Sequence, residues 1–94
     1  MKIYNVLIES LYYDGDDFVL ADTNTEVYSF STQEKAISFL DGARNEVLEE
    51  NPSITNVYQD GADYVALYEE FDGCERIAYK ITIYEVELDS DDPS

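Results

Sequence analysis

Residues 31–50 of the chain read STQEKAISFLDGARNEVLEE, and their apolar side chains recur with the period of an α-helix. The residues that share this apolar face are Ala36, Leu40, Ala43 and Val47. Ser31 and Glu34 match the capping box, in which a hydroxyl and a carboxylate accept backbone N–H groups where a helix starts. Asn51 and Pro52 are residues at which a helix commonly ends. The sequence predicts a helix over about 32–50 that packs on a sheet.

The chain before this helix is rich in β-branched, aromatic and apolar residues, which favour strands. Residues 2–13 predict one strand that is buried on much of both faces. Asp14, Gly15, Asp16 and Asp17 form the turn signal that follows. A second strand then starts at 18–21, and after a loop over 22–25 the residues 26–30 continue it or add another.

Three further strands are predicted after the helix, over 54–58, 64–71 and about 75–88, with a turn at 59–63. Asp72 and Gly73 between the last two favour a two-residue type I′ hairpin. The whole indicates an α+β fold in the order ββαβββ, an antiparallel sheet of about four to six strands with one helix packed on a face.

The two-residue turn also predicts a register for this hairpin. On one face it pairs Tyr64 with Ile81, Ala66 with Tyr79, and Tyr68 with Ile77. On the other face Glu69 lies opposite Arg76, a favourable pair. Glu70 then lies opposite Glu75, a like-charge contact that is tolerable only at an exposed end or at a basic partner.

The length of 94 residues fits one domain, which we expect over residues 1–88, followed by a disordered acidic tail at 89–94. The first residues lack the apolar stretch of a signal peptide. A single cysteine, Cys74, agrees with a reducing compartment. We therefore expect a cytoplasmic protein.

Residue types that commonly carry catalysis are missing from the sequence. It contains no histidine, and Cys74 therefore has no imidazole to activate it. The four glycines are isolated and make no phosphate loop. The carboxylates near residues 14–17 and 22–26 lack the glycine and the closing glutamate of a calcium-binding loop. We expect a non-enzymatic protein with no metal and no cofactor.

Acidic residues dominate the charge, with 22 aspartates and glutamates against 5 lysines and arginines and a net charge of −17. Such a surface is repelled by nucleic acid and by anionic lipid, and it attracts basic surfaces. We therefore expect no direct nucleic-acid or membrane contact. The expected partner is a basic protein surface, of the kind that nucleic-acid-binding proteins and complexes expose.

Candidate partner-binding carboxylates lie in the turns, on the predicted helix and in the strand before the hairpin. They are Asp14, Asp16, Asp17, Glu34, Asp41, Glu46, Glu49, Glu50, Asp60, Asp63, Glu69 and Glu70. Tyr12 and Tyr13 join them, because tyrosine buries area while its hydroxyl stays in water. High strand propensity is the alternative explanation for the tyrosines, and a solvated face for the carboxylates. An exposed edge strand leaves room for a homodimer.

The acidic α+β plan and the segment Tyr28-Ser29-Phe30-Ser31-Thr32-Gln33-Glu34-Lys35-Ala36 resemble small acidic anti-defence proteins of phages and mobile elements, which include DNA mimics and anti-CRISPR proteins. The resemblance implies a stoichiometric inhibitor whose carboxylates stand where phosphates would sit, acting in the host cytoplasm if phage-encoded. It implies no catalytic residue. Two other interpretations remain open: an interaction or structural module whose acidity serves solubility, and adaptation to high salt.

Overall fold

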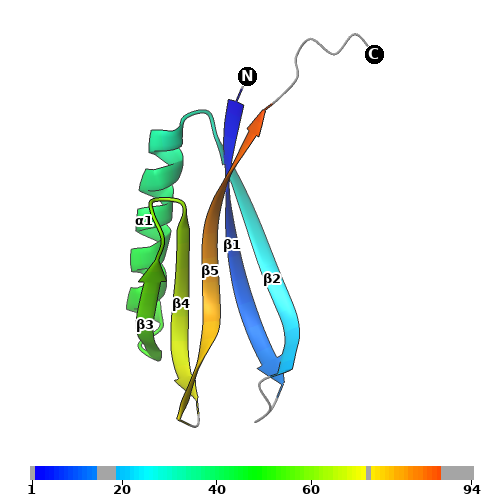
Figure 1. Ribbon diagram of the computed structural model, residues 1–94, viewed down its shortest axis with the longest axis vertical. Coiled ribbons are helices and arrows are strands. Elements are labelled where there is room, and N and C mark those ends of the chain that lie inside the picture. The colour runs from blue at the N-terminus through cyan, green and yellow to red at the C-terminus, as the bar shows by residue number, and fades with distance from the viewer. Residues whose placement is uncertain (1, 15–18, 72, 88–94) are drawn as a thin grey trace.

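The computed structural model describes residues 2–14, 19–71 and 73–87 of the chain. Its elements are β1 (Lys2–Asp14), β2 (Val19–Phe30), α1 (Gln33–Glu50), β3 (Ile54–Gln59), β4 (Tyr64–Phe71) and β5 (Cys74–Glu87). These strands form one antiparallel sheet in the order β2-β1-β5-β4-β3, and α1 packs on one face of it (Figure 1). The predicted α+β fold and its ββαβββ order are confirmed.

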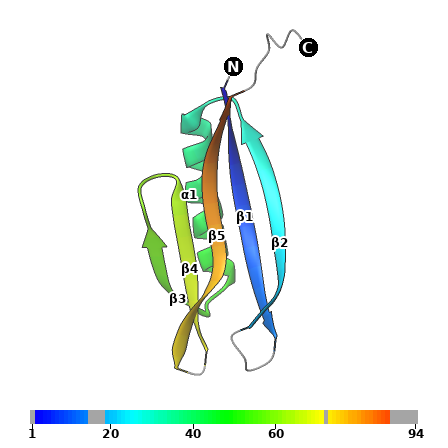
Figure 2. The ribbon, with the colours of Figure 1, turned by 45° about the vertical axis from the view of Figure 1, so that its right-hand side comes forward.

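The last strand of the chain, β5, lies in the middle of the sheet between the hairpins β1–β2 and β3–β4. β1 pairs with β5 from Lys2, opposite Glu87, to Ser10, opposite Tyr79. Beyond that point the two hairpins diverge, as the lower ends of the strands show in Figure 2. One pairing between the first and last strands therefore joins two locally formed hairpins into a single sheet.

The core lies between α1 and the sheet. Its largest fully buried side chains are Leu40 of α1, Val6 of β1, Val65 and Leu67 of β4, and Ile81 of β5. Ala36 is also fully buried, as the helical spacing predicts. Burial of each large side chain contributes about 1.5–3 kcal/mol, so this apolar face is what fixes α1 to the strands.

The other side of the sheet, which we call the open face, carries no second layer among the described elements, and α1 lies behind it in Figure 2. Side chains alternate along a strand, so the open face holds the residues between the core positions. Its apolar and tyrosine members are Ile3, Leu7, Leu11, Val27, Tyr58, Tyr64, Ala66, Tyr68, Ile77, Tyr84 and Val86. Ile3 and Leu7 are half-buried there, so β1 is covered in part on both sides, as predicted.

The helix starts one residue later than the capping-box pattern predicts. Thr32 is the N-cap, and its Oγ1 accepts a hydrogen bond from the backbone N–H of Lys35 at 3.3 Å. The prediction of Ser31 as the cap is wrong, because two adjacent hydroxyl residues offer the same chemistry and the pattern does not choose between them. At the other end the backbone N–H and the side-chain Nδ2 of Asn51 both donate to the carbonyl of Val47, each at 2.9 Å.

The loop predicted over 22–25 is part of β2, so that prediction is wrong. Asn24 lies opposite Ser10 and Thr23 opposite Leu11. Strand propensity of aspartate and asparagine is low, but pairing with the long β1 supplies the backbone partners that keep this segment extended. The register shifts between Tyr12 and Tyr13, which places residue 21 in a bulge.

The predicted hairpin register holds near the turn and fails further along. Glu70 lies opposite Glu75, Glu69 opposite Arg76, and Tyr68 opposite Ile77, as predicted. Beyond that point Leu67 lies opposite Tyr79, Ala66 opposite Lys80, and Tyr64 opposite Thr82, so the other two predicted pairs are wrong.

The cause of this shift is one extra residue, Ala78, in β5. If Ala78 were paired in the ladder instead of forming a bulge, Ile81 would lie opposite Tyr64 and share its face, on the side away from Val65. The bulge lets the turn keep its two residues while Ile81 and Ile83 join Val65 in the core.

Candidate functional site

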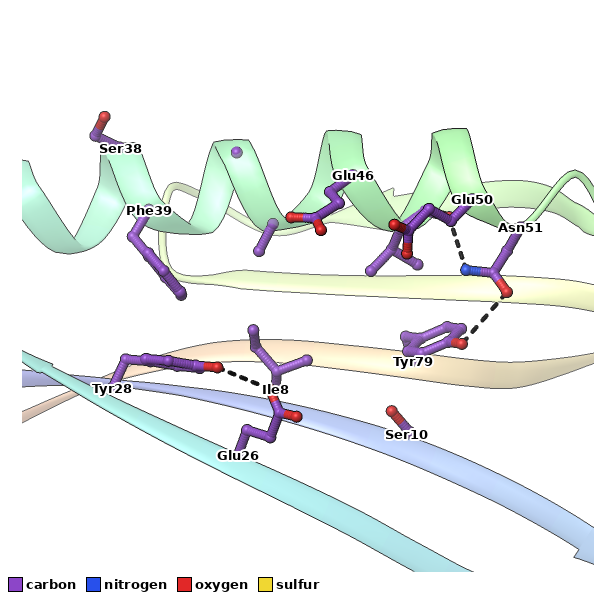
Figure 3. A pocket seen from close by; sticks show the side chains of 13 residues that line it. Ile8, Ser10, Glu26, Tyr28, Ser38, Phe39, Glu46, Glu50, Asn51 and Tyr79 are labelled. Carbon is purple, nitrogen blue, oxygen red and sulfur yellow. Dashed lines mark hydrogen bonds between the residues drawn. The ribbon is translucent and has the colours of Figure 1, made fainter.

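A groove of about 640 Å³ lies between α1 and the part of the sheet formed by β1, β2 and β5. Its apolar floor includes Ile8 from β1 with Phe39, Ala43 and Val47 from α1. The helix packs directly on the core positions of β1 and β5, and this leaves the space toward the edge strand β2 unfilled. Figure 3 shows the groove with the helix above and the strands below.

Three carboxylates line this groove from its two walls (Figure 3). Glu46 and Glu50 lie four residues apart on α1 and therefore point to the same side of the helix. Glu26 comes from β2, across the groove from them. No lysine or arginine is among the described residues that line the space. The groove thus combines an apolar floor with uncompensated negative charge.

Tyr28 fixes the β2 wall of the groove. Its hydroxyl donates a hydrogen bond to Oε2 of Glu26 at 2.9 Å, and its ring lies 4.7 Å from that of Phe39 between centroids. The hydrogen bond to Glu26 and the negative charge of that carboxylate raise the pKa of the Tyr28 phenol above its ordinary value of 10.0. Tyr28 therefore keeps its proton at neutral pH and holds Glu26 in place.

The other end of the groove is closed by Tyr79 of β5 and Asn51 at the end of α1. The Tyr79 hydroxyl donates to Oδ1 of Asn51 at 3.4 Å, while the amide nitrogen of Asn51 donates to the Val47 carbonyl. The residue that stops the helix thus also ties it to the sheet. Both walls are held by side-chain contacts before any ligand arrives.

The groove is suited to binding a cation that carries an aliphatic or aromatic part. Carboxylates accept hydrogen bonds from ammonium and guanidinium groups, and the floor accepts the carbon chain that bears them.

Within the described residues, no three histidine, cysteine, aspartate or glutamate side chains gather as metal ligands do. No helix in that part of the chain is long and apolar enough to cross a membrane.

Two of the predicted site residues, Glu46 and Glu50, meet in the groove. The other helix candidates do not line it: Glu34 and Glu49 are exposed elsewhere on α1, and Asp41 pairs with Arg44 at 3.3 Å.

The remaining predicted carboxylates are spread over the turns. Asp60 and Asp63 are exposed between β3 and β4, and Glu70 lies at the far end of β4. Asp16 and Asp17 lie outside the described residues. Asp14 ends β1, and its side chain also lies outside what is described.

Tyr13 and Glu69 are engaged within the chain, around Arg76. Nε of Arg76 donates to Oε1 of Glu69 at 2.8 Å, and its guanidinium lies 4.5 Å from the centroid of the Tyr13 ring. The Tyr13 hydroxyl donates to the Ile77 carbonyl at 2.6 Å, and burial raises the pKa of this phenol. These contacts join the two hairpins where β1 and β5 separate. Tyr12 lies beside these residues, where it lines a small hollow together with Tyr13, Glu69 and Arg76, and it is 53% exposed.

Sequence reasoning missed the residues that complete the groove, namely Glu26, Tyr28, Phe39, Asn51 and Tyr79. One signal was available. Glu26, Tyr28 and Phe30 alternate on β2, so all three share the face that meets the helix. Recognising the groove also required the β1–β2 register, which sets Glu26 beside Ile8.

Comparison with known proteins identifies no relative: no protein-family model, curated protein or solved structure matches the chain.

Proposed function

We propose that the protein is a non-enzymatic acidic inhibitor that binds the basic, nucleic-acid-binding surface of a partner protein, with the groove beside α1 as its contact site. The observation that carries this proposal is the composition of the groove. Three carboxylates from two elements surround an apolar floor, with no described lysine or arginine among the lining residues. The net charge of −17 supports it, since such a field steers basic surfaces toward the protein.

A lysine or arginine side chain matches both parts of the groove. Its methylene stem packs on Ile8 and Val47, and its charged head reaches Glu46 or Glu50 on one wall, or Glu26 on the other. Long cationic side chains bury their stems on apolar surface in this way while the charge remains near polar groups.

Affinity must come from several such contacts together. Glu46 and Glu50 are exposed, and an exposed ion pair contributes only about 0–1 kcal/mol. The carboxylates outside the groove, such as Glu34 and Glu49, add to the long-range field without forming the docking point. Binding should therefore weaken with salt, because salt screens exposed charges.

Inhibition follows from competition. A basic surface that nucleic acid occupies holds phosphates through lysine and arginine contacts. Carboxylates that occupy the same contacts exclude the phosphates. This mode of action requires no catalytic group in the inhibitor.

The test is capture from a bacterial lysate at low salt, with three immobilised forms of the protein. The forms are the wild type, the groove variant Glu46→Gln/Glu50→Gln, and the matched control Glu34→Gln/Glu49→Gln. Both variants lose two negative charges from the same helix. Circular dichroism checks that each remains folded.

We expect the wild type and the control to retain a basic nucleic-acid-binding protein that salt or added DNA releases, and the groove variant to lose it. If no basic protein is retained at low salt, the proposed function is wrong. Equal losses in both variants would instead assign the binding to net charge and contradict the groove as its contact site.

A further inference from the structure

The open face differs from the rest of the surface in both chemistry and charge. Val27, Tyr58 and Tyr84 are 56%, 54% and 49% exposed there, and contiguous apolar surface of this kind often marks an interaction site. The rings of Tyr58 and Tyr64 lie in an edge-to-face arrangement with centroids 6.3 Å apart. Tyrosine is enriched in protein interfaces because it buries a large area and keeps a polar tip.

Charge is sparse and balanced in the centre of this face. The only carboxylate among the described residues there is Glu9 of β1, and its direct cross-strand partner on β5 is Lys80. Neither side chain belongs to an ion pair between described residues. By strand alternation Glu70 and Glu75 also lie on the open face, but at the far end of the β4–β5 hairpin and away from its centre. A basic partner therefore gains little from the centre of the face.

We propose that the open face is the interface of a homodimer, in which the sheets of two copies stack face to face about a two-fold axis parallel to the strands and between β1 and β5. Sheets that stack in this way lie about 10 Å apart, with their strands nearly aligned. The groove beside α1 lies on the opposite side of the sheet and stays accessible in each copy.

The two-fold axis makes the central charges self-complementary. Rotation about it places Glu9 of one copy over Lys80 of the other, and the reverse contact forms at the same time. An isologous interface requires this property, because one patch must match itself. A patch with a single unbalanced charge at its centre would repel its own copy.

The same rotation matches the neighbouring apolar positions. The row that crosses the sheet next to the charged pair contains Val27, Leu7, Thr82 and Tyr64. The axis sets Val27 over Tyr64 and Leu7 over Thr82 of the other copy.

The available area is of the size that a stable interface needs. The strands that face one another across this axis are β1 with β5 and β2 with β4, and four strands spaced about 4.8 Å apart over about nine residues give roughly 570 Å² on each copy. A specific interface buries at least about 1,000 Å² in total, or about 500 Å² on each partner. A second copy therefore covers most of the face.

The salt dependence of dimer formation differs from that of binding to a basic partner, so the two can be told apart. Each copy carries a net charge of −17, so two copies repel at long range and added salt weakens the repulsion. We expect the dimer to tighten by about fivefold or more between low and high salt, whereas binding to a basic surface weakens over the same range.

The decisive experiment is charge complementation in sedimentation velocity, with the variants Glu9→Lys and Lys80→Glu. Each variant places two like charges at the centre of the face, so each alone should be monomeric. An equimolar mixture should form a one-to-one heterodimer, because every facing pair is then of opposite sign. Circular dichroism verifies folding, and Val27→Lys, at an exposed position, provides an independent variant that should also be monomeric.

A wild type that stays monomeric at high salt and at roughly millimolar concentration, the top of the range where weak dimers form, overturns the proposal. So does a mixture that behaves as its separate components while both remain folded. Neither result bears on the groove, whose test uses substitutions on the other side of the sheet.

Discussion

The two sides of the sheet come from the same strands and differ in nearly every surface property. On the helix side, the alternate residues of β1, β4 and β5 build a core, and its margin is a groove lined by carboxylates. On the open face, the intervening residues are largely apolar or tyrosine, with one balanced charge pair at the centre. The net charge of the chain therefore does not predict the charge of either side of the sheet, because alternate residues of each strand point to opposite sides.

The largest expected effect comes from a deletion in β5 that shifts its register by one residue and so moves a core side chain to the open face. Deletion of Thr82 makes Ile81 and Ile83 neighbours, and because successive side chains point to opposite faces, one of them must leave the core. We expect a loss of about 3 kcal/mol or more in the free energy of unfolding by urea.

Deletion of Ala78 is the matched control in the same strand. It removes the extra residue of the bulge and leaves the pairs on either side intact. We expect a change within about 1 kcal/mol, as for an ordinary tolerated substitution. Similar losses in the two deletions would show that Ala78 has a role beyond adjusting the register.

The next effect compares burial on the two sides. Leu40→Ala on the helix side removes a fully buried side chain and should cost about 2–5 kcal/mol. Val27→Ala on the open face should cost less than about 1 kcal/mol in the monomer, because that side chain is 56% exposed. Both are measured by urea unfolding at low protein concentration and low salt. A cost for Val27→Ala that approaches the Leu40→Ala value would contradict this ranking.

The smallest effect concerns Tyr28 on the groove wall. Glu26→Gln removes the carboxylate whose hydrogen bond and negative charge raise the pKa of the phenol, so this pKa should move down toward its ordinary value. In the wild type the phenol holds its proton more tightly in the folded state, so any stability linked to it is present at neutral pH and is lost as the pH rises above 10. NMR titration of the Tyr28 ring in both proteins measures the shift. No difference between them would mean that the Glu26 contact is absent in solution.

Much of the fold could be predicted because its signals are local. The helix follows from the spacing of Ala36 and Leu40, and the last hairpin follows from Asp72 and Gly73. The bulge at Ala78 could not be predicted, because β4 is apolar on both faces. Val65 and Leu67 compete there with Tyr64, Ala66 and Tyr68 for the core, and alternation alone does not choose between them.

The groove was less predictable than the fold because it depends on two elements at once. Glu46 and Glu50 were visible as acidic helix residues, but their position relative to Glu26 is set by how α1 crosses β1 and β2. The residues near Glu26 in the sequence do not indicate how the helix is oriented on these strands. Glu69 is the opposite case: its predicted cross-strand pair with Arg76 is confirmed, because the nearby two-residue turn alone sets that register.

The central position of β5 has a consequence for how the chain folds during synthesis. The hairpin β1–β2 and the helix leave the ribosome early, but β1 cannot meet its second neighbour until residues 74–87 have been made. Until then β1 exposes an unpaired edge beside apolar side chains, a combination that promotes aggregation.

Pairing between strands this far apart in sequence also carries a large loop-closure cost and slows folding. Glu9, Glu26 and the other early carboxylates remain on an incomplete sheet throughout this interval. Their mutual repulsion between nascent chains gives the acidity a second effect, which is to keep unfinished copies apart until β5 arrives.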